Sequence, residues 1–299
     1  EHGCVLTIGN FDGVHRGHQA LLAKLVAKSR ETGLPAAMLT FEPHPREYFT
    51  HENRPTRLTS LREKILLLEA QGVDRLYIGR FNARLAALTA EEFVEDMLIR
   101  GLGVRHLLIG DDFRFGKARK GDFSMLKAAG EVAGFTVESM HTLDYEGERV
   151  SSSAVRCALI DGDMDHAARL LGRPYSISGR VMHGDKIGRT IGFPTANIQL
   201  KHRSPPMMGI YTVSVDGLAD RPWPGVASIG VRPTITDAGR PTLEVNLFDW
   251  NTDCYDAHLR VNFLRKQRDE ERYDSLEALT AQIARDAEEA RAYFVQNPL

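Results

Sequence analysis

The sequence contains few cysteines, and none of them is placed for a structural site. Among 299 residues there are 3 cysteines, Cys4, Cys157 and Cys254, and no C-x-x-C spacing occurs. An odd number of widely separated cysteines excludes a disulfide framework and a zinc knuckle. This usage is typical of a reducing compartment, so the sequence predicts a cytoplasmic protein.

Long apolar runs are also missing from the chain. No window approaches the roughly 18 consecutive apolar residues that a transmembrane helix requires. The chain opens on a strand-like run, "CVLTIG", rather than on the apolar core and small-residue cleavage site of a secretion signal. We therefore expect no membrane partner. Because residue 1 is Glu rather than Met, we also expect a short upstream segment.

An excess of charge of one sign is absent as well. The chain has 38 basic and 40 acidic residues, which give a formal net charge of −2. Nucleic-acid-binding proteins usually carry a basic patch or a net positive charge, so we expect no nucleic-acid partner. The apolar content of 42% and the charged content of 26% are ordinary for a soluble globular protein. These totals leave a homo-oligomer open.

The first part of the chain alternates short apolar runs with longer amphipathic segments. Examples are "CVLTIG" followed by "HQALLAKLVAKSRETG", and "HLLIG" followed by "DFSMLKAAGEVAG". A repeated alternation of strand and helix predicts a parallel sheet with helices on its faces. Glycines follow these helical segments at positions where a left-handed cap is expected. They are Gly33, Gly72, Gly101 and Gly134.

The later part of the chain consists of short β-rich runs broken by Gly and Pro. These runs are "YSISGRVMHG", "GIYTVSVDG", "GVASIGVRP", "TLEVNLFDW" and "HLRVNFLRKQR". Closely spaced strands with turn signals predict an antiparallel barrel or sandwich, and helical periodicity returns over Ser275–Phe294. The length fits two domains, which we place at residues 1–173 and 174–299. The expected fold class is therefore α/β followed by all-β.

The turn after the first strand is rich in glycine and carries two histidines, in "IGNFDGVHRGHQALLAKL". Gly9 and Asn10 lie where the strand ends, and His15 and His18 are spaced to share one face of a starting helix. The unpaired N–H groups and positive end of such a helix favour phosphate binding. The alternative is that His15 caps the helix and His18 is a half-buried surface residue. A metal site is less favoured because no third ligand is identifiable.

The sequence lacks the G-x-G-x-x-G fingerprint after this strand, which disfavours a dinucleotide-binding Rossmann domain. The H-x-G-H pattern is instead the signature of the adenylyl-transferring nucleotidyltransferase superfamily. The stretch "GNFDGVHRGHQALL" resembles its flavin adenylyltransferase branch. Four further stretches agree with that branch in order: "TFEPHP" (Thr40–Pro45), "RLTSLREK" (Arg57–Lys64), "IGDDFRFGKARKGD" (Ile109–Asp122) and "VSSSAVR" (Val150–Arg156).

This resemblance implies a Rossmann-like nucleotidyltransferase domain that transfers the adenylyl group of ATP to FMN and releases pyrophosphate. It implies catalytic roles for His15, His18 and Arg156. The residues that it implies for nucleotide or flavin binding are Gly9, Asn10, Phe11, Asp112, Ser151 and Ser152. Arg156 is suited to phosphate because its guanidinium can donate two parallel hydrogen bonds; the alternative is an ion pair on a helix surface.

The stretch "GDDFRFGKARKGD" has two interpretations. Phe113 and Phe115 face the flavin ring in one and pack in the core in the other. Lys117, Arg119 and Lys120 form either a basic lid or an ordinary solvated loop. One departure from the family is Ser153, which stands where the family more often has Thr and keeps the hydroxyl group.

A second glycine-rich stretch, "GRVMHGDKIGRTIGFPTANI", spans Gly179–Ile198. Backbone amides in such a stretch can approach phosphate, although the G-K-[ST] of a Walker A motif is missing. Thr195 and Asn197 would share one face of an extended chain, where their oxygen atoms could hold one Mg²⁺. The alternative is that both residues stabilise a turn. Glu244 alternates with apolar neighbours, which directs it toward solvent or toward an active-site groove.

These later stretches resemble the riboflavin kinase family in their order along the chain: "GRTIGFPTANI", "GIYTVSV", "GVASIGVRPT" and "TLEVNLFDW". The resemblance implies a β-barrel kinase domain in which Thr195 and Asn197 bind Mg²⁺ with ATP. It implies that Glu244 is the base that activates the terminal ribityl hydroxyl. Further implied binding residues are Gly184, Gly188, Arg189, Gly192 and Pro194. The segment "LRKQRDEERY" departs from the family's more usual Leu-Arg-x-Glu with Phe, since Tyr273 takes the place of Phe.

Together the two resemblances cover nearly the whole chain and indicate the bacterial family of bifunctional riboflavin kinases and FAD synthetases. They imply riboflavin, FMN, FAD and ATP as partners, Mg²⁺ with ATP as cofactor, and flavin as both substrate and product. One rival hypothesis is a flavin-binding or adaptor module that has lost catalysis. The other is an adenylyltransferase for a pantetheine or nicotinate nucleotide acceptor, which the kinase-like second part argues against.

Overall fold

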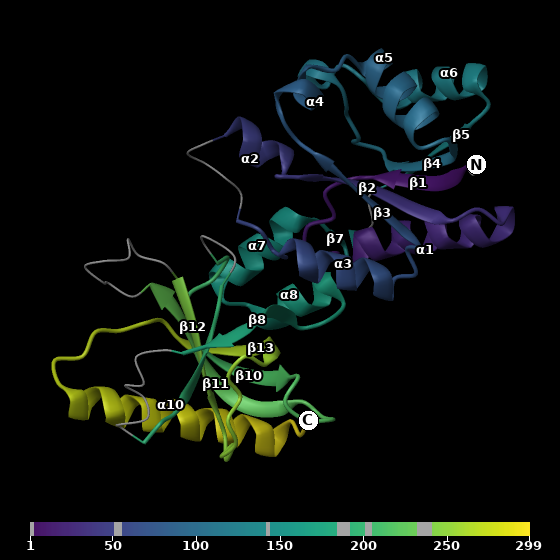
Figure 1. Ribbon diagram of the computed structural model, residues 1–299. Coiled ribbons are helices and arrows are strands. Elements are labelled where there is room, and N and C mark those ends of the chain that lie inside the picture. The colour runs from purple at the N-terminus through teal and green to yellow at the C-terminus, as the bar shows by residue number, and fades with distance from the viewer. Residues whose placement is uncertain (1–2, 51–55, 142–143, 184–191, 201–204, 232–240) are drawn as a thin grey trace. The chain divides into compact units, whose positions relative to one another are not determined.

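The computed structural model describes residues 3–50, 56–141, 144–183, 192–200, 205–231 and 241–299 (Figure 1). The chain forms two compact units. The first unit comprises Glu1–Pro55 and Leu61–Ser151, and the second comprises Thr56–Ser60 and Ser152–Leu299. Each unit is built around a sheet of its own.

A parallel five-stranded sheet forms the centre of the first unit, with the order β3-β2-β1-β4-β5. Its strands are β1 (Cys4–Ile8), β2 (Ala36–Glu42), β3 (Arg75–Arg80), β4 (Val104–Gly110) and β5 (Thr136–Met140). The expected Rossmann-like fold is confirmed. The strand order reverses between β1 and β4, and ligands of open α/β sheets bind beyond the carboxyl ends of the strands at such a point.

Helices cover both faces of this sheet (Figure 1). Helices α1 (Arg16–Thr32) and α3 (Leu61–Ala70) pack on one face, around Leu22, Leu25 and Leu68. The other face is covered by α5 (Ala90–Glu92), the π-helix η1 (Phe93–Gly101) and α6 (Phe123–Ala133). All five residues of β1 are therefore buried, which explains its continuous apolar run. The shorter elements of this unit are α2 (Pro45–Phe49), α4 (Ala83–Ala87), η2 (Lys117–Arg119), β6 (Asp144–Tyr145) and β7 (Glu148–Arg149).

The glycines that follow the helices largely behave as expected. Gly33 and Gly134 are left-handed caps with φ of 67° and 78°, and Gly72 also has a positive φ. The expectation for Gly101 is wrong. That residue ends η1, and the left-handed residue is Gly103 (φ 58°), because Leu102 still has helical dihedral angles.

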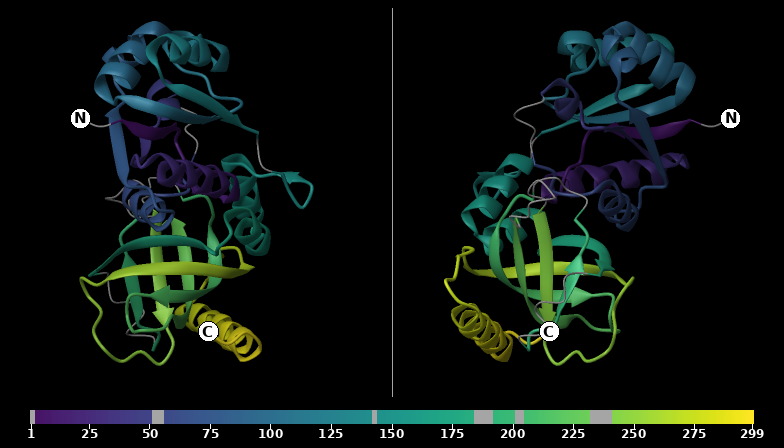
Figure 2. Two further views of the ribbon diagram at one scale, coloured as in Figure 1. Left: turned by 90° about the vertical axis from the view of Figure 1, so that its right-hand side faces the viewer. Right: turned by 60° about the vertical axis from the view of Figure 1, so that its left-hand side comes forward.

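The second unit is a closed antiparallel barrel with the order β10-β11-β12-β9-β8-β13 (Figure 2). Its strands are β8 (Tyr175–Met182), β9 (Thr195–Ile198), β10 (Gly209–Asp216), β11 (Trp223–Val231), β12 (Pro241–Leu247) and β13 (His258–Arg268). The expected β-barrel is confirmed, and it includes β9, which was not among the runs predicted as strands. Leu243, Val245 and Leu247 are buried, whereas Glu244 and Asn246 between them are half-buried on the outer face.

Among its described residues, the second unit also has three helices. Helices α7 (Ser152–Asp161) and α8 (Met164–Leu171) pack together, and α8 also contacts β8 and β13. Helix α10 (Leu276–Gln296) lies against β10 and β11 (Figure 1). Helix α8 ends at the left-handed Gly172, three residues before β8, so the predicted boundary after residue 173 falls in the connection between them. As a domain boundary, it stays a prediction.

Candidate active sites

A tight turn follows β1 at the point where the strand order of the first unit reverses. Phe11, Gly13 and Val14 all have positive φ angles, of 47°, 83° and 42°. A Cβ atom on Gly9 would lie 2.7 Å from Cε2 of Phe11, so a larger residue there would displace the Phe11 ring. The glycines therefore let the backbone turn sharply into α1.

His15 and His18 lie side by side where α1 begins. Their rings stack with centroids 3.6 Å apart and planes at 18°, and the His18 ring also stacks on Phe11 at 4.5 Å. His15 is the N-cap, and its Nδ1 accepts a long hydrogen bond of 3.4 Å from the backbone N–H of His18. His15 therefore caps the helix and also shares a face with His18, so the two interpretations of the motif are compatible. The pair stands at the positive end of α1, where anions bind.

The electrostatic surroundings of His18 keep its imidazole neutral. Burial is the main cause that holds its pKa well below the usual value, and the neighbouring His15 and Lys64 lower it further. Its Nδ1 is buried and makes no hydrogen bond within the described part of the chain. A neutral imidazole has one N–H that it can donate to a phosphate oxygen. Lys64 is 7% exposed and lies in α3.

The other predicted residues of this site are divided between the two units. Asn10 follows β1 and is half-buried, whereas Asp112 follows β4, is exposed and pairs with Arg149 at 3.5 Å. Ser151 is the last residue of the first unit. Ser152 and Arg156 lie in α7 of the second unit, where Nε of Arg156 donates to the carbonyl of Thr56 at 2.6 Å. Their shared contact with one ATP stays a prediction.

The phenylalanines of the "GDDFRFGKARKGD" stretch pack in the core. Phe115 is 5% exposed and packs on Phe93, with ring centroids 5.4 Å apart. Phe113 is half-buried, stacks on Phe115 and packs against the same core cluster. Phe115 therefore follows the core-packing interpretation, because the sheet face under η1 and α6 needs its ring. A flavin contact of the half-buried Phe113 stays a prediction. Lys117, Arg119 and Lys120 are exposed.

A group of four aromatic rings was missed by the sequence interpretation. Phe81 follows β3 and makes edge contacts with Phe41, Tyr48 and Phe49 at centroid distances of 6.0, 5.3 and 5.7 Å. Phe49 is 64% exposed, which is unusual for a phenylalanine. The available signal was the run Tyr48-Phe49 shortly after "TFEPHP".

The predicted kinase residues meet on the outer face of the barrel. Asn197 of β9 pairs in register with Glu244 of β12, and Thr195 pairs with Asn246. Oγ1 of Thr195 donates to Oε2 of Glu244 at 3.4 Å. Nδ2 of Asn246 donates to the carbonyl of Pro194 at 2.8 Å. Thr195 and Asn197 therefore belong to a strand, and the turn interpretation is wrong.

The remaining predicted residues of this site precede β9. Gly192 is exposed with φ of 86°, a conformation that favours glycine, and Pro194 is exposed as well. Gly184, Gly188 and Arg189 lie outside the described residues. Their roles in nucleotide binding stay predictions.

Two further polar residues stand on the β11 side of Glu244. Ser228 pairs in register with Glu244, and its hydroxyl donates to Oε1 of Glu270 at 3.4 Å. The Glu270 carboxylate occupies the space where a Cβ of Gly230 would be. Burial raises the pKa of Glu270, and the charge of Glu244 adds to this effect. Ser228 alternates with apolar neighbours in the sequence, which indicates that its side chain points outward from the barrel. No local pattern in the sequence linked Glu270 to Ser228.

Comparisons with known proteins also match an N-terminal and a C-terminal part of the chain to different families. The FAD synthetase family matches residues 1–154, and the riboflavin kinase family matches residues 171–294. A bifunctional riboflavin kinase/FMN adenylyltransferase from Pseudomonas fluorescens is 53% identical over 293 residues, which cover 98% of this chain and 94% of the relative. Its counterparts from Escherichia coli K12 and Bacillus subtilis are 51% and 39% identical, over 98% and 97% of this chain and 94% and 92% of their own lengths.

A solved structure has the same fold over almost the whole chain. It is a crystal structure described as a macrolide-efflux protein from Streptococcus pneumoniae, with a TM-score of 0.83 and 32% identity. The match covers 97% of this chain and 94% of that protein. The fold and the order of the two parts thus agree with the family expected from the motifs. The chain belongs to the transferase family of bifunctional riboflavin kinase/FMN adenylyltransferases, with its FAD synthetase part N-terminal and its riboflavin kinase part C-terminal.

Proposed function

We propose that this chain makes FAD from riboflavin in two steps, at two separate sites. The observation that carries the proposal is that each family-matched part has its own constellation of reactive groups. The stacked His15 and His18 lie at the switch point of the first unit. Thr195, Asn197 and Glu244 adjoin one another on the barrel.

In the kinase step, Glu244 accepts the proton of the terminal ribityl hydroxyl of riboflavin. The hydroxyl oxygen then forms a bond to the γ-phosphorus of ATP, the bond from that phosphorus to the β–γ bridging oxygen breaks, and ADP leaves. A carboxylate can serve as this base if it lies within hydrogen-bond reach of the hydroxyl. The neighbouring hydroxyl of Thr195 and amide of Asn197 place oxygen atoms beside it.

The oxygen atoms of Thr195 and Asn197 fit Mg²⁺ brought in with ATP. Mg²⁺ prefers oxygen ligands and usually shares them with substrate phosphates. Among the described residues, no group of three or more His, Cys, Asp and Glu side chains could hold a metal ion. Two oxygen donors leave most positions of an octahedral ion to water and substrate phosphates, which suits an ion bound with a nucleotide. When bound, Mg²⁺ would neutralise charge that develops on the transferred phosphoryl group.

In the adenylyl transfer step, a phosphate oxygen of FMN forms a bond to the α-phosphorus of ATP. The bond from that phosphorus to the α–β bridging oxygen breaks, and pyrophosphate leaves. Such transfers depend mainly on positioning and charge neutralisation. His15, His18 and the N–H groups at the start of α1 are suited to the phosphates. Arg156, Ser151 and Ser152 add hydrogen-bond donors in this proposal, and Gly9, Asn10, Phe11 and Asp112 line the site.

The aromatic group around Phe81 offers a surface for the flavin ring of FMN. Phe49 presents a largely exposed ring, and Tyr48 and Phe81 support it from the side. Flat aromatic ligands stack on such surfaces with a favourable free energy of about 0.5–1.5 kcal/mol beyond area burial. The buried Phe115 has no part in this surface.

We also propose that the enzyme is cytoplasmic and acts without nucleic acid. Either a monomer or a homo-oligomer is compatible with this proposal. The cysteines support the reducing compartment, since Cys4, Cys157 and Cys254 are all free thiols. No helix among the residues described by the structure is long and apolar enough to cross a membrane. Cell fractionation and light scattering after gel filtration would test compartment and oligomeric state.

Product analysis tests the proposed function directly. The purified chain is incubated with riboflavin, ATP and Mg²⁺, and riboflavin, FMN, FAD and pyrophosphate are followed by chromatography over time. We expect FMN to rise before FAD, and excess EDTA to stop both steps. Formation of FMN alone would confine activity to the barrel. Tight flavin binding without turnover would favour the binding-module hypothesis.

A further inference from the structure

Polar groups form a row across three neighbouring strands of the barrel. In register, Asn197 of β9 adjoins Glu244 of β12, and Glu244 adjoins Ser228 of β11. The Ser228 hydroxyl then reaches the Glu270 carboxylate. Because neighbouring strands lie about 4.8 Å apart, the two ends of this row lie on opposite sides of Glu244. If the metal and nucleotide lie at the β9 end, Glu270 lies at the end left for the acceptor alcohol.

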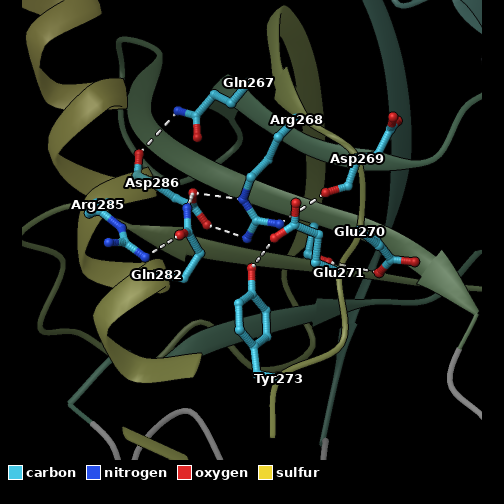
Figure 3. A network of polar contacts seen from close by, with 10 residues as sticks. Gln267, Arg268, Asp269, Glu270, Glu271, Tyr273, Gln282, Arg285 and Asp286 are labelled. Carbon is cyan, nitrogen blue, oxygen red and sulfur yellow. Dashed lines mark hydrogen bonds and ion pairs between the residues drawn. The ribbon is translucent and has the colours of Figure 1, made fainter. Parts of the chain in front are cut away.

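Glu270 belongs to residues 269–274, which connect β13 to α10. The first turn of this connection is fixed by Arg268, the last residue of β13 (Figure 3). Its Nε and Nη2 donate to the two carboxylate oxygens of Asp286 on α10, at 2.9 and 2.7 Å. Its Nη1 donates to the carbonyl of Asp269 at 2.9 Å. Arg268 thus ties the residue before Glu270 to the middle of α10.

The Arg268–Asp286 pair is removed from solvent and has further polar partners. The side chains are 19% and 7% exposed. Nε2 of Gln282 donates to Oδ1 of Asp286 at 2.9 Å, and Nε2 of Gln267 donates to the Asp286 carbonyl and to Thr212 of β10. The hydrogen bond from Arg268 to Asp286 is the main cause that raises the pKa of Arg268. A planar two-pronged pair with these contacts permits one orientation of the guanidinium.

We infer that Asp286 is a positioning residue of the kinase reaction. It holds Arg268, Arg268 holds the start of residues 269–274, and that segment places Glu270 on the acceptor side of Glu244. This inference rests on the proposed kinase function. It adds Asp286, which lies on α10, a helix that has none of the groups assigned to the reaction. Glu270 is not itself a reacting group, so its displacement should weaken binding of the acceptor and raise the KM for riboflavin.

A second ion pair on the same helix provides a matched control. Arg291 of α10 donates from Nη1 and Nη2 to the two carboxylate oxygens of Asp249, at 2.7 and 2.9 Å. That pair also attaches α10 to the barrel, but Asp249 follows β12, and among the described residues no hydrogen bond or ion pair joins it to residues 269–274. Replacing Asp286 or Asp249 by Asn removes one charge and one two-pronged contact in each case.

The experiment compares wild type with Asp286→Asn, Asp286→Glu, Asp249→Asn and Glu270→Gln, below the onset of thermal unfolding. For Asp286→Asn we expect the KM for riboflavin to rise by at least about tenfold. The KM for ATP and the rate of FAD formation from supplied FMN should stay within about twofold of wild type, since both depend on other groups. Glu270→Gln should change the same parameter, Asp286→Glu should restore part of the loss, and Asp249→Asn should have no effect.

Three results would overturn the inference. The first is an unchanged riboflavin KM in Asp286→Asn. The second is an equal loss in Asp249→Asn, which would assign the effect to general attachment of α10. The third is a parallel fall in FAD formation, which would indicate loss of folded protein. Failure of the proposed function is distinguishable from all of these, because the wild-type chain would then form no FMN.

Discussion

The centres of the two proposed sites are built in different ways. In the first unit, the groups from Gly9 to His18 come from one stretch, the turn after β1 and the start of α1, whereas the remaining proposed residues come from later in the chain. The kinase groups of the second unit come from β9, β12, β11 and the segment after β13. A contiguous site is fixed by local backbone geometry and a helix N-terminus, whereas a distributed site depends on the register of strands far apart in sequence.

The largest expected effect tests whether the two sites work separately. Replacing Glu244 by Gln removes the proposed base but keeps the size of the side chain. We expect FMN formation to fall by about 10²–10⁴-fold, the usual contribution of general base catalysis. FAD formation from supplied FMN should be unchanged, because Glu244 is not among the groups proposed for that reaction. Chromatographic rates for both reactions would check this, and equal loss of both would contradict the division into two sites.

The reciprocal variant, His18→Ala, should act on the other reaction. We expect FAD formation from FMN to fall by about 10²–10³-fold, which is typical for removal of one donor to a developing negative charge. Phosphorylation of riboflavin should continue at the wild-type rate. Steady-state kinetics with riboflavin or FMN as separate substrates would measure both values. A kinase defect in this variant would show that the contiguous site also supports the barrel reaction.

A smaller effect is expected when the turn itself is disturbed. In Gly9→Ala the new Cβ would lie 2.7 Å from the Phe11 ring, which stacks on His18. Overpacking of this kind lowers stability by about 1–3 kcal/mol. Displacement of the Phe11 ring would also shift His18, so we expect FAD formation to slow by about tenfold or more. The matched control is Gly33→Ala, where φ is 67° and no atom lies within 4 Å of the new Cβ.

Gly33→Ala should lower stability by about 1 kcal/mol through backbone strain and leave the rate of FAD formation unchanged. Urea unfolding and initial rates would be measured for both glycine variants. Equal rates of FAD formation in the two variants would show that the packing of Phe11 on His18 does not affect the reaction.

The smallest expected effect concerns the pH dependence of stability. His18 has a pKa well below 6.5 in the folded chain, mainly because it is buried, and returns to about 6.5 on unfolding. Between these two values the unfolded chain binds one more proton, so stability falls as the pH drops below about 6.5. Between pH 7.5 and pH 5.5, the free energy of unfolding of wild type should fall by up to about 1.4 kcal/mol more than that of His18→Gln. Unfolding curves at pH 7.5 and 5.5 would check this, and parallel losses would contradict it.

Much of the first unit follows from local patterns in the sequence. The alternation of strands and helices predicted the parallel sheet, because each element's periodicity fixes its buried face. The spacing of His15 and His18 predicted a shared face, and the rings do stack. The error at Phe115 has a tertiary cause. An aromatic residue beside a polar loop has the same local signature whether it meets a ligand or, as here, covers the sheet beneath η1 and α6.

The second unit was predicted as a barrel, but its site was only partly visible. Thr195, Asn197 and Glu244 were recognised from motifs, whereas their adjacency depends on the register of β9 with β12. Ser228 and Glu270 were missed because the hydrogen bond between them joins β11 to the segment after β13. Such a contact produces no periodic pattern in the sequence of either segment. A shift of one residue in either register would turn these groups to the other face of the strand.

By itself the sequence determined the two-part organisation, the class of each fold, the family and the groups held within one turn or one strand. These properties depend on short-range spacing, which the covalent chain fixes directly. The tertiary structure decided that Phe115 is a core residue and that Phe41, Tyr48 and Phe49 contact Phe81. It also decided that Asp286 of α10 pairs with Arg268 of β13. Such contacts arise only when separate elements pack together, because packing sets which side chains distant in sequence meet.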